Sequence, residues 1–142
     1  MTTAERHRLT RLRRLERVRA IAKRQLAGET AQAEDALSQL RALTERTRDL
    51  AAEYAARNDA FDGFDLVQTG RFAAGLCRIV NSAGMEANAA QQLADRKLVE
   101  LAAAERRRAA VEERLHATEK AIGKRPAQAS VAPRRKIGTD LE

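Results

Sequence analysis

Two stripes of apolar side chains, spaced alternately three and four residues apart, dominate the sequence. The first is apolar at ten of thirteen positions: Leu12, Leu15, Arg19, Ala22, Leu26, Glu29, Ala33, Ala36, Leu40, Leu43, Thr47, Leu50 and Tyr54. The second is apolar at twelve of fifteen: Ala73, Leu76, Val80, Ala83, Ala87, Ala90, Ala94, Lys97, Leu101, Ala104, Arg108, Val111, Leu115, Thr118 and Ile122. This spacing keeps one face of a helix against a neighbouring helix. The pattern predicts two long helices that form a coiled coil.

A polar segment separates the two stripes. Residues 58–65 contain one Asn, three Asp and one Gly, which favour a turn over a helix. Thr69 is the expected N-cap of the second helix, and Gly123 with Pro126 are expected to end it.

The predicted fold is all-α, a long antiparallel two-helix coiled-coil hairpin over residues 1–124. We expect helices over about 5–57 and about 70–123, joined by a turn over about 58–69. Residues 125–142 contain Pro, Ser and a basic run, and they are predicted to form a disordered basic tail.

Composition excludes several other classes of protein. Apolar residues make up 44% of the chain, but about half of them are Ala and only 3% of all residues are aromatic. This is too little bulk for a β-sandwich or an α/β enzyme of this length. Cys77 is the single cysteine, so no intramolecular disulfide can form. No apolar run fits a signal peptide or a membrane span, and we expect a soluble cytoplasmic protein.

Charge is unevenly distributed along the chain, which has a net charge of +7. Residues 1–25 hold nine basic and two acidic side chains, residues 26–70 hold four and nine, and residues 96–136 hold twelve and five. A hairpin would bring the two basic segments together at its open end and leave the turn acidic. The basic excess favours acidic partners such as nucleic acid, anionic lipid or an acidic protein surface.

The polar breaks in the stripes give a hypothesis for the helix register. If Phe64 faces Ala73, Glu29 lies opposite Arg108 and could form an interhelical pair that fixes the alignment. The alternative is that both long side chains extend to water.

No motif for catalysis is present. The sequence lacks a Gly-rich phosphate loop and the patterns HExxH, CxxC and GxSxG. We therefore predict no enzymatic activity, no catalytic residues, no cofactor and no metal. His7 and His116 are expected to be solvated, and Cys77 is expected to pack beside Leu76.

Two clusters of side chains are candidates for binding. Arginines crowd the start of the first helix and could neutralise phosphates, although no aromatic residue is interleaved and no parallel zipper follows: Arg6, Arg8, Arg11, Arg13, Arg14, Arg17 and Arg19. Two interpretations of this cluster therefore stay open. The chain is a basic helical nucleic-acid-binding or scaffold protein, which could form a dimer, or the arginines form a solvated charged face. Tyr54, Phe61, Phe64 and Phe72 surround the turn, where they cap the core or form a patch for a partner.

The layout from about Arg6 to Gly123 resembles the FliJ family of flagellar export proteins and its relatives in type III secretion, which are short antiparallel two-helix coiled coils. The likeness lies in a basic first helix with leucines at heptad spacing and in Glu53-Tyr54 near its end. It also lies in Phe72 with Leu76, which open the second helix after a polar turn.

The resemblance implies a non-enzymatic cytoplasmic component at the base of the flagellar export apparatus. Such proteins couple the hexameric export ATPase to the cytoplasmic domain of the export gate membrane protein, with export chaperones as further partners. Contact with the membrane runs only through these partners, and nucleic acid is not an expected partner.

Carried over position by position, the resemblance assigns two sets of contact residues. The gate contacts are Leu50, Tyr54, Phe72, Leu76, Ile79 and Ala83, where aliphatic residues partly replace the polar and aromatic residues of the family. The ATPase contacts at the basic open end are Arg11, Arg13, Arg14, Arg17, Arg107, Arg108 and Arg114.

Overall fold

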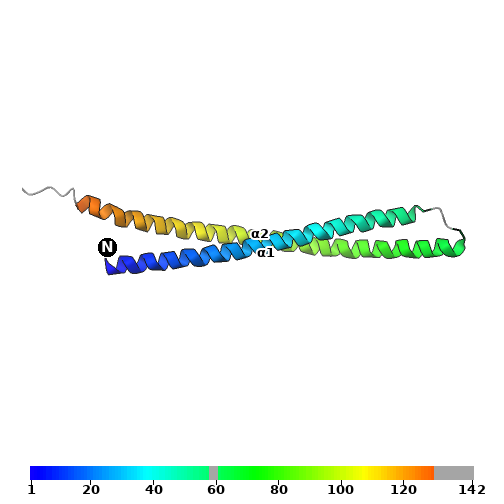
Figure 1. The fold of residues 1–142 in the computed structure, drawn as a ribbon, viewed down its shortest axis with the longest axis horizontal. Coiled ribbons are helices and arrows are strands. Elements are labelled where there is room, and N and C mark those ends of the chain that lie inside the picture. The colour runs from blue at the N-terminus through cyan, green and yellow to red at the C-terminus, as the bar shows by residue number, and fades with distance from the viewer. Residues whose placement is uncertain (58–60, 130–142) are drawn as a thin grey trace, which may run out of the picture. The chain divides into compact units, whose positions relative to one another are not determined.

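Two helices make up nearly all of the described chain. The computed structural model describes residues 1–57 and 61–129, with side chains described up to residue 125. Helix α1 spans Thr3–Ala55 and helix α2 spans Gly63–Ala129 (Figure 1). Within the described ranges there are no strands. The predicted all-α helical hairpin is therefore confirmed.

Each helix begins at a capping motif. The Thr2 hydroxyl accepts a hydrogen bond from the Glu5 N–H at 3.2 Å, and the Glu5 carboxylate accepts one from the Thr2 N–H at 2.8 Å. At the start of α2, the Asp62 carboxylate accepts a hydrogen bond from the Asp65 N–H at 2.8 Å. These side chains bind N–H groups that the first turn of a helix leaves without partners.

Helix α2 begins earlier than the sequence analysis predicted. Because Asp62 supplies the cap, α2 starts at Gly63, and Thr69 lies inside the helix instead of capping it. The predicted turn over about 58–69 is therefore too long. The same Asp residues that indicated a turn also favour a helix N-terminus.

Helix α2 also ends later than predicted. It continues through Gly123 and Pro126 to Ala129. A proline removes one N–H donor and crowds the carbonyl four residues earlier, so α2 ends soon after Pro126, although Ala127, Gln128 and Ala129 are good helix formers. The predicted tail therefore overlaps the helix at its start, and its remaining residues, 130–142, lie outside the described residues.

The packing of α1 on α2 divides into two units. The terminal unit comprises Met1–Ala22 and Ala104–Glu142, and the turn unit comprises Lys23–Ala103. Pairs between the helices run antiparallel in each. They are Glu5–Arg125 and Arg13–Glu119 in the terminal unit, and Glu29–Lys97 and Arg41–Gln91 in the turn unit.

The predicted stripe of α2 is confirmed at every position. All fifteen residues, from Ala73 to Ile122, are buried or half-buried. Its most buried members expose 2–7% of their surface: Leu76, Ala83, Ala94, Ala104 and Val111. This stripe is the α2 side of the interhelical seam.

The predicted stripe of α1 is confirmed only in part. The series that repeats every seven residues from Leu12 to Tyr54 is at least half-buried. Between its later members the seam contains Leu37, Thr44 and Ala51, which expose 6%, 8% and 7%. The predicted residues Ala36, Leu43 and Leu50, each one position earlier, are exposed. Helix α1 therefore carries three adjacent apolar rows in the turn unit, and α2 covers two of them.

The predicted pairing of Glu29 with Arg108 is wrong. Glu29 binds Lys97 at 2.9 Å, whereas Arg108 binds Glu16 at 3.4 Å and Glu112 at 2.9 Å. The register differs because the connection between the helices is shorter than predicted. This alignment gives each cation in the α2 seam a carboxylate partner.

The first turns of α2 extend beyond the end of α1 in the turn unit. Tyr54, near the end of α1, packs edge-on against Phe72, with ring centroids 4.6 Å apart. Residues of α2 before Phe72 consequently lie beyond α1 (Figure 1). Leu66 has the phase of the seam, seven residues before Ala73, but it is 60% exposed. Phe61 and Phe64 are also exposed.

Candidate interaction surfaces

Residues that flank the seam of the turn unit lie on two opposite sides. Arg41 and Gln91 form a hydrogen bond across the helices on one side. Glu29 and Glu100 both bind Lys97, at 2.9 and 3.4 Å, and mark the other side. In a coiled coil, residues seven positions apart lie on the same side. A flanking residue can therefore be assigned to a side by counting in sevens from Arg41 and Gln91 or from Glu29 and Glu100.

One side of the turn unit is largely apolar between residues 36–50 of α1 and 72–93 of α2, where Glu86 is the one charged residue at these repeat positions. Ala36, Leu43 and Leu50 share the repeat position of Glu29, while Phe72, Ile79 and Leu93 share that of Glu100. Five of these side chains are large and expose 38–52% of their surface. They define the apolar side: Leu43, Leu50, Phe72, Ile79 and Leu93.

The residues predicted to contact the export gate fall into two groups. Leu50, Phe72 and Ile79 belong to the apolar side, and Tyr54 is half-buried at its edge, with the Arg57 guanidinium 4.2 Å from its ring centroid. Leu76 and Ala83, which expose 7% and 6%, pack in the seam. Sequence reasoning missed Leu93 and assigned Leu43 to the core. Leu43 and Leu93 each come directly before a seam residue, Thr44 and Ala94. This apolar neighbour was the signal in the sequence that could have identified them as part of the apolar side.

The terminal unit has a basic side. Arg8 and Ala121 line one groove, which places both on the same side. Arg114 and Arg107 lie seven and fourteen residues before Ala121 and share its position. Arg11 and Lys124 lie three residues after Arg8 and Ala121, at the edge of this face. We call Arg8, Arg11, Arg107, Arg114 and Lys124 the basic side; all five are exposed.

Carboxylates in the terminal unit are concentrated on the opposite side. Glu119 pairs with Arg13 there at 3.0 Å, and Glu112 and Glu105 occupy the same repeat position. No Asp or Glu occupies the repeat positions of the basic side in the described part of this unit. Among ion pairs of residues 1–57 and 61–129, none involves a basic-side residue.

The structure separates the arginines predicted to contact the ATPase. Arg11, Arg107 and Arg114 belong to the basic side. Arg14 lines a groove with Arg11 and so adjoins this side, whereas Arg17 is exposed on another face of α1. Arg13 is paired with Glu119, and Arg108 is half-buried in the seam. Sequence reasoning missed Arg8 and Lys124 as members of this face. Once the α2 stripe was known, the repeat positions of Arg8 and Lys124 could have indicated that they belong to the basic side.

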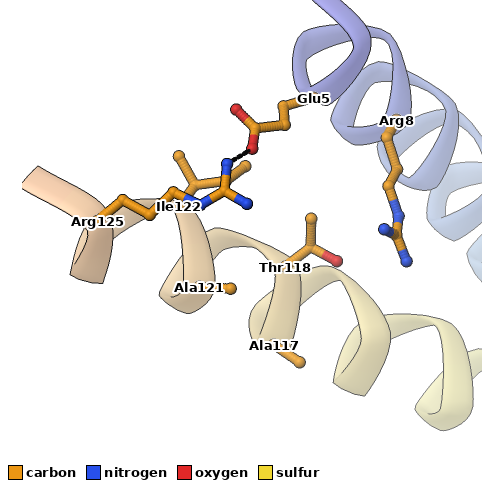
Figure 2. Close-up of a pocket in the computed structure, with 7 residues that line it drawn as sticks. All are labelled: Glu5, Arg8, Ala117, Thr118, Ala121, Ile122 and Arg125. Atoms are coloured by element: carbon orange, nitrogen blue, oxygen red, sulfur yellow. Dashed lines mark hydrogen bonds and ion pairs between the residues drawn. The ribbon is translucent and has the colours of Figure 1, made fainter. Parts of the chain in front are cut away.

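The groove at the basic side has a volume of about 310 Å³. Figure 2 shows Ala117, Thr118, Ala121 and Ile122 along α2, with Arg8 on the facing helix. The Glu5–Arg125 pair crosses between the helices at one end. A hydrogen bond from the Thr2 N–H lowers the pKa of Glu5, with a smaller contribution from Arg125. Glu5 is therefore engaged with its own chain through the Thr2 N–H and Arg125.

Lys97 is the cation of the turn-unit seam. Its hydrogen bond to Glu29 raises the pKa of Lys97 and lowers the pKa of Glu29. The Thr30 hydroxyl, beside it, donates to the Leu26 carbonyl at 2.7 Å and contacts the Lys97 carbonyl at 3.3 Å. The polar side chains around Lys97 are thus bonded within the hairpin, whereas in the terminal unit the buried Nε atoms of Arg19 and Arg108 have no hydrogen-bond partner among the described residues.

Features of chemical sites are sparse in the described residues. His7 and His116 are exposed, as predicted, but Cys77 is exposed as well and does not pack in the core. Residues 1–57 and 61–129 contain no group of three or more potential metal ligands. In the same ranges, neither helix has a stretch apolar enough to cross a membrane.

Comparison with known proteins adds no relative: no family model, curated protein or solved structure matches the chain.

Proposed function

We propose that this chain is a non-enzymatic coiled-coil component of a flagellar type III protein export apparatus. It acts in the cytoplasm and couples the export ATPase to the cytoplasmic domain of the export gate. The terminal unit binds the ATPase through its basic side, and the turn unit contacts the gate through its apolar side. Export chaperones are further partners.

The charge segregation of the terminal unit carries this proposal. Residues 1–22 and 104–129 hold fourteen Lys and Arg against six Glu. The basic side gathers five of these cations without a carboxylate at the same positions, so its field is uncompensated there. A surface of this kind attracts an acidic protein surface and accelerates its encounter.

The turn unit supports the second half of the proposal. Leu50, Phe72 and Ile79 expose 38%, 47% and 52% of their surface on one side. Exposed large apolar side chains of this kind are typical of protein interfaces. In this arrangement, Leu76 and Ala83 support the surface by packing beneath it.

Binding to purified export ATPase hexamers tests the role of the basic side. The triple variant Arg11→Glu, Arg107→Glu, Arg114→Glu should weaken binding at least about tenfold, because it reverses three uncompensated charges. The control Arg6→Glu, Arg17→Glu, Arg106→Glu makes the same charge change on other faces and should retain most of the affinity. Equal loss in both variants, or no binding by the unaltered chain, would contradict the proposal.

Nucleic acid is the competing partner for a basic surface. Affinity for unrelated duplex DNA that falls steeply with salt, together with no affinity for the ATPase, would reject the export role. That result would favour the alternative of a basic helical nucleic-acid-binding protein.

A further inference from the structure

The turn unit has an apolar row that its own hairpin does not cover. A two-helix coiled coil needs two apolar rows per helix, whereas helices of larger bundles carry a third. In α1 this extra row contains Ala36, Leu43 and Leu50, and α2 adds Phe72, Ile79 and Leu93 beside it, with Glu86 as the one charged residue of that row between Phe72 and Leu93. The pattern is therefore that of a bundle with more helices than one hairpin provides.

We propose that the apolar side binds a second copy of this chain, so that two turn units form an antiparallel four-helix bundle. The hairpin alone has a thin core, because no side chain among the described residues is more than 98% buried. Its most buried residues include Ala33, Thr44 and Ala51, which contribute little apolar area. Closing the apolar side on its equivalent gives the exposed leucines a core.

The size of this surface suits a dimer. From Phe72 to Leu93, α2 is about 33 Å long, and two helices side by side are about 20 Å wide, which gives on the order of 650 Å². A specific interface buries roughly 800 Å² on each partner. With a twofold axis near Leu50, the part of this surface towards Leu93 meets the first turns of α2 of the other chain, where Leu66 and Phe64 are exposed.

The charges at the apolar side favour a second copy over an unrelated partner. Arg46 lies four residues before Leu50 and Glu53 lies three residues after it, and both are exposed. In a twofold interface a surface meets its own equivalent. An axis near Leu50 places Arg46 of one chain beside Glu53 of the other, twice. Around the leucines the neighbouring positions Gln32, Gln39, Ser82 and Ala89 are uncharged, whereas Glu86 is a charged residue in the same row as Ile79 and Leu93.

This dimer does not depend on the proposed export role. It would, however, cover Leu50, Phe72 and Ile79, the residues assigned to the gate. Dimerisation and gate binding would then exclude one another, and the dimer would be the form of the free protein.

Light scattering on the purified full chain tests the dimer without any export partner. The expected mass is twice 15.7 kDa at micromolar concentration and above. Leu43→Glu and Leu50→Glu should each shift it to the mass of one chain. Leu98→Glu is the matched control, because Leu98 is 46% exposed and lies on the opposite side, seven residues after Gln91. A single-chain mass for the unaltered protein, or equal dissociation by Leu98→Glu, overturns the proposal.

A disulfide cross-link tests the position of the twofold axis. Unlike the Glu variants, it places no charged side chain in the interface. In a Cys77→Ser background, Leu50→Cys should form a covalent dimer under mild oxidation, whereas Leu98→Cys should stay monomeric on a denaturing gel. Circular dichroism should show unchanged helix content in both. Cross-linking at Leu98→Cys but not at Leu50→Cys contradicts this interface.

Discussion

Lys97 shows how ion pairing allows a charged side chain to lie in the seam between the helices. Its ammonium group, on a side chain 25% exposed, binds Glu29 at 2.9 Å and Glu100 at 3.4 Å. The sequence indicated that Lys97 and Glu29 interrupt the two stripes. Their pairing was not predictable, because it depends on the register and hence on the length of a connection that contains ambiguous turn and cap residues.

The Glu29–Lys97 pair should make stability depend on pH. The pKa of Glu29 is lowered from 4.5 in the folded chain, so its stabilisation is present above pH 4.5 and is lost as the pH falls through the folded value. Thermal unfolding should therefore show Glu29→Gln less stable than the unaltered chain at pH 7. This difference should shrink below about pH 4.

The exposed residue Glu45, which forms no ion pair with the described residues, supplies the control for that experiment. Glu45→Gln should leave the melting temperature nearly unchanged at both pH values. A gap between Glu29→Gln and the unaltered chain that persists at low pH would assign its effect to packing instead of charge.

At the scale of the helices, phase was predictable in α2 but only partly in α1. The two rows of the α2 stripe are apolar at twelve of fifteen positions along the whole helix, whereas the row of Phe72, Ile79 and Leu93 is apolar only near its start, so the pattern favoured one face. In α1 a third row, including Leu43 and Leu50, is as apolar as the row that contains Thr44 and Ala51. Local sequence cannot choose between these rows, because the choice depends on which one meets the partner helix.

The start of α2 provides a prediction for one element. Asp62→Ala removes the acceptor for the Asp65 N–H and should destabilise the chain by about 1 kcal/mol in chemical denaturation. Amide hydrogen exchange should speed up in residues 63–66. Asp62→Asn keeps a cap of similar quality and should lose much less; equal losses in both variants would show that the cap bond is not the cause.

At the scale of the whole molecule, the exposed basic surface and the exposed apolar surface lie in different units. The terminal unit holds the basic side, and the turn unit holds the apolar side. Counting residues along the chain predicted a basic open end. The phase of α2, which was predictable, also places Arg107 and Arg114 on one side and Glu105, Glu112 and Glu119 on the other; that Arg8 and Arg11 lie beside the two arginines depends on how α1 packs.

The net charge of +7 should make the chain more stable when salt is added. Exposed ion pairs such as Arg13–Glu119 contribute little, whereas repulsion among the clustered cations opposes folding. Raising NaCl from about 20 mM to about 200 mM shortens the screening length severalfold and should raise the melting temperature. Circular dichroism at 222 nm measures this. A falling melting temperature would mean that the ion pairs outweigh the repulsion.

Periodicity and composition in the sequence were sufficient for the two helices, their antiparallel order and the seam face of α2. The helices and the seam face of α2 follow from local physics, since the 3-4 spacing and the lack of proline before residue 126 act within each helix, and the antiparallel order follows from the short polar connection between them. The register, the covered rows of α1, and the basic and apolar sides were decided only by tertiary packing. They depend on which side chains meet across the seam, and that in turn is set by the cap at Asp62 and by the carboxylates available to Lys97 and Arg108.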